Sequence, residues 1–288
     1  MEMNIDISGT TKLVGLIGSP VSQSMSPAMH TASFAKLGID AVYLGFDVKL
    51  DQLADAVVGL KQLGAVGYNV TMPCKTYIGE YLDELSEAAD LMGAVNTVVI
   101  EDGKSVGHNT DGAGFVQNIR NLGCDPAGKV VTVIGAGGAG SAVYTQVAID
   151  GASEVRIFNQ RDDFWDKTAA RIGRVAEKTG ARISLKDLAD TGALEKSIAQ
   201  SDILVNATRV GMVPNVDECL VEEEWLHEGR LVADTVYEPH ETLLIKRAKA
   251  RGLVTAGGLG MLLQQLALGE AIWFGCETPV EYLEKMFY

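Results

Sequence analysis

The sequence predicts an α/β protein of two domains, an N-terminal domain on a mostly parallel sheet and a second, doubly wound domain. Three observations support this prediction. Short apolar runs alternate with helical segments along most of the chain. One apolar run, residues 129–134, passes directly into the glycine-rich residues 135–140. The length of 288 residues exceeds that of one ordinary domain.

The glycine-rich segment has the pattern G-x-G-x-x-G at Gly135, Gly137 and Gly140. In such a motif one glycine makes the tight turn, one lets the backbone approach a pyrophosphate, and one permits close helix–strand packing. A helix over 139–149 and a β-rich run at 153–158 complete a βαβ unit of about 30 residues. Glycine turns also occur for geometric reasons alone, but this context favours a dinucleotide site. Its predicted ligating residues are Gly135, Ala136, Gly137, Gly138, Ala139 and Gly140.

Composition excludes several classes of function. Hydrophobic residues at 47% and charged residues at 22% are ordinary globular values. No apolar stretch reaches the ~20 residues of a membrane span, and the polar N-terminus does not resemble a signal peptide. A net charge of −14 makes a nucleic-acid partner improbable. The four cysteines and four histidines are scattered, which favours free thiols in a reducing cytoplasm over a zinc site.

The N-terminal domain is predicted from alternating strands and helices. Strands are expected at 12–18, 41–46 and 65–70, and helices at 27–37 and 50–63, with Ser26 as the N-cap of the first helix and Pro27 at its first position. Short helices are expected at 75–82 and 86–91, then a hairpin of 94–100 and 105–108 around Asp102-Gly103. A helix over 111–122 ends at Gly123.

The second domain continues the alternation. Its strands are expected at 129–134, 153–158, 182–185, 203–207, 230–234 and 253–256, and its helices at 139–149, 164–179, 190–199 and 242–251. Two final helices, 260–274 and 279–287, are expected to return to the first domain. The predicted domains are therefore residues 1–113 completed by 261–288, and residues 114–260.

Polar residues gather where the N-terminal strands end, namely Ser22, Ser24, Ser26, Asn69, Thr71, Lys75, Asn96, Asn109 and Asp111. The carboxyl ends of strands in an open α/β sheet line the ligand crevice, so these residues are expected to face a common cleft. Neutral hydrogen-bonding groups with one cation and one carboxylate suit a small polyhydroxylated acid. Lys75 and Asp111 are the pair able to move protons. The structural alternatives are that Ser26 only caps a helix, Asn109 only forms a turn, and Lys75 is a surface charge.

At these residues the sequence resembles the shikimate dehydrogenase family, and specifically its quinate/shikimate dehydrogenase branch. The resemblance runs nearly end to end. It rests on the segments S-Q-S-M-S-P (22–27), N-V-T-M-P-C-K (69–75), G-A-V-N-T-V (93–98), N-T-D-G (109–112), G-A-G-G-A-G (135–140), N-A-T-R-V-G-M (206–212), V-Y-E-P (236–239) and G-L-G-M-L-L-Q-Q (258–265). The V-Y-E-P segment departs from the family pattern at one position, because Glu238 stands where the family usually has the asparagine of V-Y-N-P.

The resemblance implies a Rossmann-like nicotinamide domain and reversible oxidation of a ring hydroxyl of shikimate or quinate to a ketone, as in aromatic amino acid biosynthesis. It implies that Lys75 and Asp111 are catalytic. It assigns the acid and its hydroxyls to Ser24, Ser26, Asn69, Thr71, Asn96, Tyr237 and Gln265. It assigns the cofactor, besides the glycine motif, to Asn159, Arg161, Asp162, Thr208, Val210, Met212, Gly258 and Met261.

The choice of cofactor depends on the residues that follow the second strand of the nucleotide unit. NADP-using relatives typically carry Asn-Arg at this point, whereas this chain has Asn159-Gln160, followed by Arg161, Asp162 and Asp163. A guanidinium that could pair with the 2′-phosphate is thus replaced, and two carboxylates repel a phosphate. We expect NAD to be preferred over NADP, with Asp162 on the ribose. Asp162 and Asp163 could also cap the next helix, which is compatible with ribose binding.

Two alternatives to a quinate/shikimate dehydrogenase remain open from the sequence. One is a dinucleotide-binding sensor without catalysis, against which the presence of both Lys75 and Asp111 argues. The other is a two-domain dehydrogenase of the methylene-tetrahydrofolate type, whose flat substrate would need stacking residues rather than serines. The sequence decides neither the preferred acid nor the oligomeric state, so that a homodimer is an open expectation.

Overall fold

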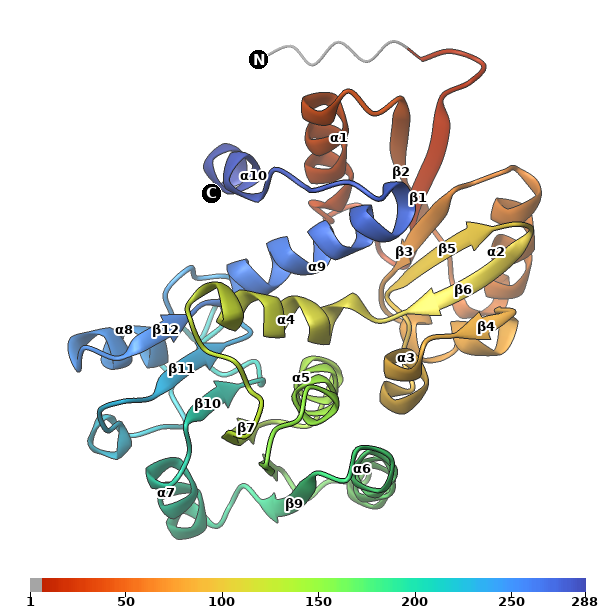
Figure 1. The fold of residues 1–288 in the computed structure, drawn as a ribbon. Helices are drawn as coiled ribbons and strands as arrows, with labels where there is room; N and C mark the ends of the chain where they lie inside the picture. Colours follow the sequence, from red (N-terminus) through yellow and green to blue (C-terminus); the bar gives the residue numbers. More distant parts are fainter. Residues whose placement is uncertain (1–6) are drawn as a thin grey trace. The chain divides into compact units, whose positions relative to one another are not determined.

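The structure is a computed structural model that describes residues 7–288 (Figure 1). It divides into two compact units. The first comprises the described residues up to Thr110 together with Gln265–Tyr288, and the second comprises Asp111–Gln264. These limits differ by three and four residues from the expected divisions after residues 113 and 260. Each unit contains one six-stranded sheet.

The sheet of the first unit has the order β2-β1-β3-β5-β6-β4. Strands β2 (Ala41–Asp47), β1 (Lys12–Gly18) and β3 (Gly67–Val70) are parallel. Strand β1 is apolar on both faces, because Leu13 and Ile17 pack into one core and Val14 and Leu16 into the other. A strand covered on both faces reads as a continuous apolar run, which is why the sequence identified it.

The other half of this sheet is the predicted hairpin of β5 (Thr97–Glu101) and β6 (Lys104–His108), antiparallel to each other. Asp102 and Gly103 both have positive φ, 51° and 76°. Those angles fit the two-residue turn that matches strand twist and favours Asp-Gly. The two-residue strand β4 (Glu84–Leu85), which pairs in parallel with β6, was not predicted, because two exposed residues carry no periodic signal.

Helices and 3₁₀ turns surround this sheet. They are α1 (Ser26–Leu37), η1 (Leu50–Gln52), α2 (Leu53–Gln62), η2 (Cys74–Thr76), η3 (Ile78–Tyr81), α3 (Glu87–Met92) and α10 (Val280–Phe287). Two predictions need correction. The N-cap of α1 is Met25 and Ser26 is the first helical residue, and the helix expected at 75–82 is two short 3₁₀ turns. Pro73 precedes the first of these turns and removes one backbone donor.

Helix α9 (Gly258–Phe274) begins in the second unit and belongs to the first from Gln265 onward. Its Trp273 packs in the core with Phe34 and Tyr43, and its indole N–H donates to the carbonyl of Val98 at 2.9 Å. A Cβ at Gly67 would lie 2.3 Å from that indole nitrogen. The absence of a side chain at Gly67 therefore lets the tryptophan lie against strand β3.

The sheet of the second unit has the order β12-β11-β10-β7-β8-β9 and is parallel throughout. In chain order the strands are β7 (Val130–Ile134), β8 (Glu154–Asn159), β9 (Arg182–Asp187), β10 (Ile203–Asn206), β11 (Leu231–Asp234) and β12 (Val254–Ala256). Counted from β7, the order is 3-2-1-4-5-6, which is the doubly wound dinucleotide-binding arrangement. Its ligand crevice lies where the order reverses, at the carboxyl ends of β7 and β10.

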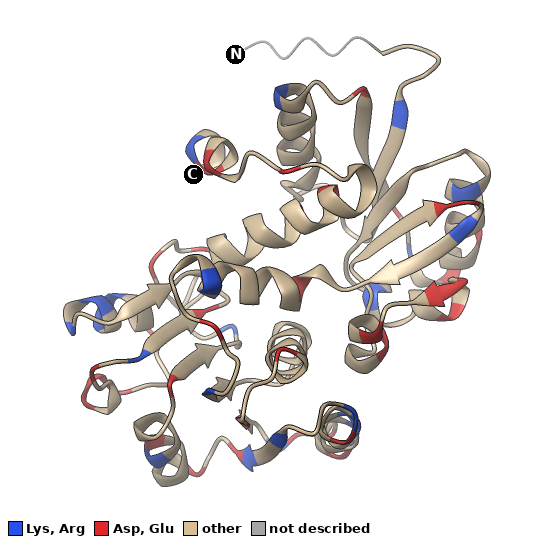
Figure 2. Cartoon of the chain, in the orientation of Figure 1, with Lys and Arg blue, Asp and Glu red and all other residues tan. Residues whose placement is uncertain are grey.

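The α-helices of the second unit lie within one residue of the predicted positions, whereas the 3₁₀ turn η4 was not predicted. They are α4 (Thr110–Asn121), α5 (Gly138–Ile149), α6 (Trp165–Thr179), α7 (Thr191–Ala199), η4 (Glu223–Trp225) and α8 (Leu243–Ala250). Helix α4 starts at Thr110, the last residue of the first unit. Helix α5 is buried along most of its length, whereas α6 carries both basic and acidic residues (Figure 2). None of the described helices is long and apolar enough to cross a membrane.

Candidate functional site

Each of the three motif positions is a glycine for a different structural reason. Gly135 has φ +99°, and a Cβ there would lie 2.8 Å from the carbonyl oxygen of Ala207. A Cβ at Gly140 would lie 2.1 Å from the carbonyl oxygen of Gly135, so this glycine lets α5 approach the end of β7. Gly137 is exposed, and a Cβ there would meet nothing within 4 Å. The loop is therefore fixed at both ends and open to a ligand in the middle.

Helix α5 starts directly behind this loop. Gly137 is its N-cap and provides no side-chain hydrogen bond to the first turn. The first N–H groups of a helix need partners from outside, and with the helix dipole they favour an anion. The residues at the end of β7 thus fit the pyrophosphate of a dinucleotide.

The end of strand β8 closes one side of the glycine loop. The amide oxygen of Asn159 accepts from the backbone N–H of Ala136 at 3.0 Å, and its amide nitrogen donates to the carbonyl of Gln160 at 2.9 Å. The Asp162 carboxylate accepts from the N–H of Phe164 at 3.0 Å. Phe164, not Asp162 or Asp163, is the N-cap of α6. Asp162 therefore shapes the loop before the helix, and this loop is exposed.

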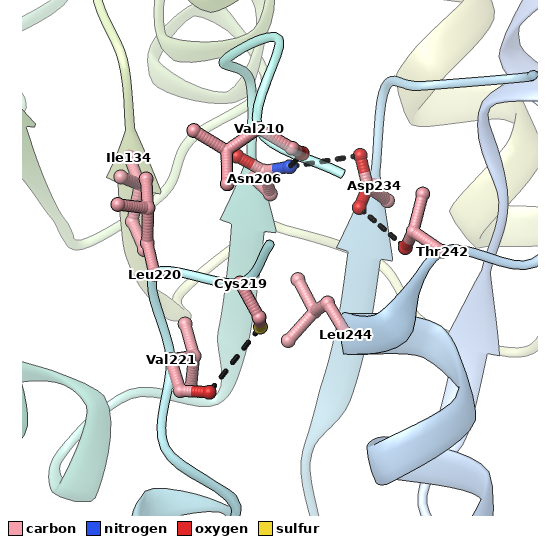
Figure 3. A pocket seen from close by; sticks show the side chains of 9 residues that line it. All are labelled: Ile134, Asn206, Val210, Cys219, Leu220, Val221, Asp234, Thr242 and Leu244. Carbon is pink, nitrogen blue, oxygen red and sulfur yellow. Dashed lines mark hydrogen bonds between the residues drawn. The ribbon is translucent and has the colours of Figure 1, made fainter. Parts of the chain in front are cut away.

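The loop after strand β10 is held by its own polar side chains. Asn206 donates from its amide nitrogen to the carbonyl of Val210 at 3.2 Å and to Asp234 at 3.1 Å (Figure 3). The hydroxyl of Thr208 donates to Asn206 at 2.7 Å and accepts from the N–H of Val210 at 3.1 Å. These bonds fix the positions of Thr208 and Val210 beside the glycine loop, where Gly135 contacts Ala207.

Asp234, at the end of β11, is the buried acid of this region. It accepts from Asn206, from the N–H of Val236 at 2.9 Å and from the hydroxyl of Thr242 at 2.7 Å. Burial raises the pKa of Asp234 to about 6, and the three donors offset only part of the cost of removing the charge from water. The carboxylate also lines a small pocket together with apolar side chains and Cys219 (Figure 3).

The remaining expected cofactor residues of this unit have mixed exposure. Met212 is exposed and Met261 is buried. A Cβ at Gly258 would lie 2.5 Å from the carbonyl oxygens of Thr235 and Val236, so this glycine allows α9 to begin against the backbone. Tyr237, expected to contact the substrate, is 47% exposed and also lies in the second unit.

In the first unit, the expected substrate residues Ser24 and Ser26 lie around the start of α1. Both are half-buried, and the hydroxyl of Ser24 accepts from the N–H of Ser26 at 3.2 Å. Ser26 also interacts with the phenol of Tyr43, whose pKa is raised well above its usual value, chiefly by burial. The Tyr43 hydroxyl in turn donates to the amide oxygen of Asn69 at 2.7 Å.

Asn69 connects this group to the next strand. Its amide nitrogen donates to the carbonyl of Asn96 at 3.1 Å and to the hydroxyl of Thr97 at 3.0 Å. With both amide hydrogens donated and the oxygen bonded to Tyr43, the side chain of Asn69 is held in one orientation. Its internal bonds make Asn69 a support for the neighbouring side chains.

Asn96, Thr110 and Gln265 form the next part of the same network. The Asn96 amide oxygen accepts from the N–H of Thr110 at 2.8 Å, and its nitrogen donates to the Thr110 hydroxyl at 3.0 Å. The Thr110 hydroxyl lies 3.5 Å from the amide oxygen of Gln265. Asn109 donates to the carbonyl of Ala94 at 3.0 Å, in keeping with its alternative role in a turn. The structure therefore brings Ser26, Asn69, Asn96 and Gln265 into one linked set, as the sequence could not show.

Thr71 and Lys75 lie on the segment that follows β3. The backbone N–H of Thr71 donates to the carbonyl of Ile17 in β1 at 2.9 Å, and the carbonyl of Lys75 accepts from the N–H of Val95, just before β5, at 2.8 Å. Lys75 is half-buried on η2. Asp111 is half-buried in the first turn of α4 and is the first residue of the second unit.

Sequence reasoning missed several supporting residues. Tyr43 and Thr97 are inward-facing strand residues whose hydroxyls bond to Asn69. Arg171, on α6, donates to the carbonyl of Ala136. No local pattern distinguishes these side chains from ordinary strand and helix residues. Within residues 7–288, no three His, Cys, Asp or Glu side chains are grouped so as to hold a metal ion.

Comparison with known proteins finds similarity along the whole chain. A family model described as the shikimate dehydrogenase substrate binding domain matches residues 16–98. A shikimate dehydrogenase (NADP(+)) of Listeria monocytogenes is 44% identical over 283 residues, which cover 98% of this chain and 97% of the relative. A quinate/shikimate dehydrogenase of Escherichia coli is 42% identical, with 98% of each chain covered.

A solved structure agrees with the sequence relatives. The crystal structure of a shikimate 5-dehydrogenase from Listeria monocytogenes, in complex with shikimate and NAD, is similar with a TM-score of 0.95. The two sequences are 44% identical, and the match covers 98% of each chain. Because the match covers nearly all residues, both units of this chain are similar to that structure.

Proposed function

The chain belongs to the shikimate dehydrogenase family, and on that premise we propose that it reversibly oxidises a ring hydroxyl of shikimate or quinate with a nicotinamide dinucleotide. The observation that carries the proposal is the 44% identity to a shikimate dehydrogenase over 98% of the chain. The open glycine loop at the start of α5 supports the dinucleotide. The two alternatives considered from the sequence gain no support from the relatives.

The proposed substrate residues are hydrogen-bonding side chains of the first unit. Ser24, Ser26, Thr71, Asn96 and Gln265 would bind the carboxylate and hydroxyls of the acid, with Asn69 holding its neighbours in place. Because Ser26, Asn69, Asn96 and Thr110 are already linked by hydrogen bonds, little side-chain freedom remains to be lost on binding.

The proposed catalytic pair is Lys75 and Asp111. A bound nicotinamide accepts the hydride from the reacting carbon, or returns it in the reverse direction. Lys75 takes the proton of the reacting hydroxyl and, as the ammonium, stabilises negative charge on the oxygen in the transition state. Asp111 is the proposed acidic member of the pair. The half-buried position of Lys75 limits solvation of its amine and still leaves it accessible to a substrate.

The proposed cofactor preference is NAD. Gln160 carries no charge, and the exposed loop after β8 has two carboxylates, Asp162 and Asp163, that repel a 2′-phosphate. Arg161 has its guanidinium 5.3 Å from the ring centroid of Trp165, a cation–π contact that directs it toward the helix. The one cation of this short segment is thus engaged by an aromatic ring. Asp162 would accept from the ribose hydroxyl.

The test is a steady-state comparison of shikimate and quinate with NAD and NADP, following the absorbance of the reduced nicotinamide. We expect turnover with at least one of the acids, and a higher kcat/KM with NAD. The control is the same assay without the acid. No turnover with any of the four combinations, in a protein that is folded by circular dichroism, would overturn the proposed activity. Turnover that favours NADP would overturn only the cofactor preference.

A further inference from the structure

Arg171 connects helix α6 to the glycine loop. Its Nη2 donates to the carbonyl oxygen of Ala136 at 3.0 Å, and its Nε donates to the hydroxyl of Tyr144 at 2.7 Å. The guanidinium carbon lies 6.0 Å from the centroid of the Tyr144 ring. The side chain of Arg171 therefore reaches from α6 to α5 and to the loop between β7 and α5.

Tyr144 holds the guanidinium of Arg171 in a fixed position. Tyr144 is fully buried on α5, so its ring and hydroxyl have one position. A guanidinium is planar and presents its N–H groups in fixed directions. With Nε on Tyr144, the direction of Nη2 toward the loop is determined. Arg171 is half-buried, which shields both bonds in part from water.

The contact at Ala136 determines the direction of the next N–H group. In a trans peptide the C=O of one residue and the N–H of the next point in opposite directions. A donor on the Ala136 carbonyl therefore turns the Gly137 N–H away from Arg171. The N–H of Ala136 is itself donated to Asn159 at 3.0 Å, so both polar groups of this residue are held from outside the loop.

We propose that Arg171 is a positioning residue for dinucleotide binding. It holds the Ala136–Gly137 peptide so that the Gly137 N–H, at the exposed N-cap of α5, faces the pyrophosphate. This inference deepens the proposed function and rests on it, because it assigns no new ligand. Arg171 acts through the backbone of the loop and does not itself contact the cofactor.

The first test measures the affinity for NADH by fluorescence titration of the complete chain. Arg171→Met should weaken NADH binding about tenfold, because the Gly137 N–H would no longer be directed at the pyrophosphate. A loss of this size is expected when one hydrogen bond to a charged group is lost. The KM for the cofactor should rise in parallel, whereas the KM for the acid and kcat at saturating cofactor should stay within about twofold. Lys178→Met, which removes a cation in the last turn of the same helix, is the matched control and should bind NADH normally.

Two further variants separate orientation from charge. Arg171→Lys keeps the positive charge but cannot donate to Tyr144 and Ala136 with the same rigid geometry, so it should be nearly as weak as Arg171→Met. Tyr144→Phe removes the acceptor and keeps the ring, and it should give an intermediate loss. Full affinity in Arg171→Lys would mean that charge alone matters, and this would overturn the proposal.

Amide hydrogen exchange of the unliganded protein supplies a readout independent of activity. In Arg171→Met, protection should fall in residues 136–141 and remain unchanged in strands β10 and β11. A uniform loss of protection across the second unit would indicate general destabilisation and would contradict a local role. Wild-type affinity for NADH in Arg171→Met would also overturn the inference. Failure of the wild-type chain to bind any nicotinamide dinucleotide would instead reject the proposed function.

Discussion

His30 and Glu270, 240 residues apart in the sequence, form a hydrogen-bonded pair inside the first unit, with Nδ1 of the imidazole 2.8 Å from a carboxylate oxygen. Neither side chain is more than 1% exposed. The other carboxylate oxygen accepts from the hydroxyls of Ser33 and Thr278, both at 2.6 Å. The His30 ring is stacked on Tyr43 at 4.4 Å between centroids. One buried acid thus joins α1, α9 and the segment after α9.

The first prediction concerns this acid. Glu270→Ala should lower the free energy of unfolding by about 3–5 kcal/mol, because it leaves His30, Ser33 and Thr278 without their buried acceptor. Glu270→Gln, which keeps the shape and one oxygen, should cost clearly less. Urea unfolding of both variants provides the measurement. An equal loss in the two variants would mean that the carboxylate is not the important feature.

The second prediction concerns Lys75. Its replacement by alanine should lower kcat roughly 10²–10⁴-fold, the usual contribution of a positioned acid–base group, because the proton of the reacting hydroxyl loses its acceptor. The measurement is kcat at saturating acid and cofactor. Lys104→Ala is the control, since Lys104 is an exposed lysine of β6 in the same unit that pairs with Glu84 of β4. Near-normal turnover in Lys75→Ala would remove this residue from the mechanism.

The third prediction concerns Ser24. Ser24→Ala should chiefly raise the KM for the acid, because a hydroxyl that binds ground and transition states alike affects binding more than kcat. Ser86→Ala is the matched comparison. The Ser86 hydroxyl accepts from the N–H of Ala89 at the start of α3, so its loss should reduce stability and leave KM unchanged. If Ser24→Ala behaves in the same way, its hydroxyl only supports the start of α1.

The fourth prediction concerns cofactor choice. Asp162→Ala should lower kcat/KM for NAD and narrow its advantage over NADP, because a ribose acceptor and a negative charge are both removed. Gln160→Arg should raise kcat/KM for NADP by supplying a guanidinium for the 2′-phosphate. Asp166→Ala, in the first turn of α6, controls for the loss of one charge. Unchanged ratios in the first two variants would show that this loop does not select the cofactor.

The fifth prediction is a pH dependence that arises at Asp234. The folded pKa of about 6 lies above the usual 3.8, so the folded protein binds this proton more tightly than the unfolded chain does. The resulting stabilisation is present below pH 3.8 and is lost as the pH rises through 6. Between pH 4 and pH 7, wild type should therefore lose up to about 3 kcal/mol of unfolding free energy relative to Asp234→Asn. Parallel pH profiles of the two proteins would contradict this.

Much of the fold could be predicted because its signals are local. The strand at 12–18 and the helix after the glycine loop follow from apolar runs and glycines within a few residues of each other. The errors occurred where the local signal was ambiguous. Ser26-Pro27 has the sequence of a helix cap, yet the helix begins one residue earlier, with Met25 as its N-cap. The apolar residues at 75–82 were too few to distinguish a helix from two 3₁₀ turns.

The sequence by itself determined the order of the elements, the glycine loop and the types of residue available for a site, because hydrophobic periodicity, turn chemistry and motif spacing all act over short distances along the chain. The tertiary structure decided which side chains support the site. Tyr43 bonds to Asn69, Arg171 to the carbonyl of Ala136, and Glu270 to His30, across separations of 26, 35 and 240 residues. Such contacts depend on how strands and helices pack against one another. The local sequence around a polar side chain does not identify the distant residue to which that side chain bonds.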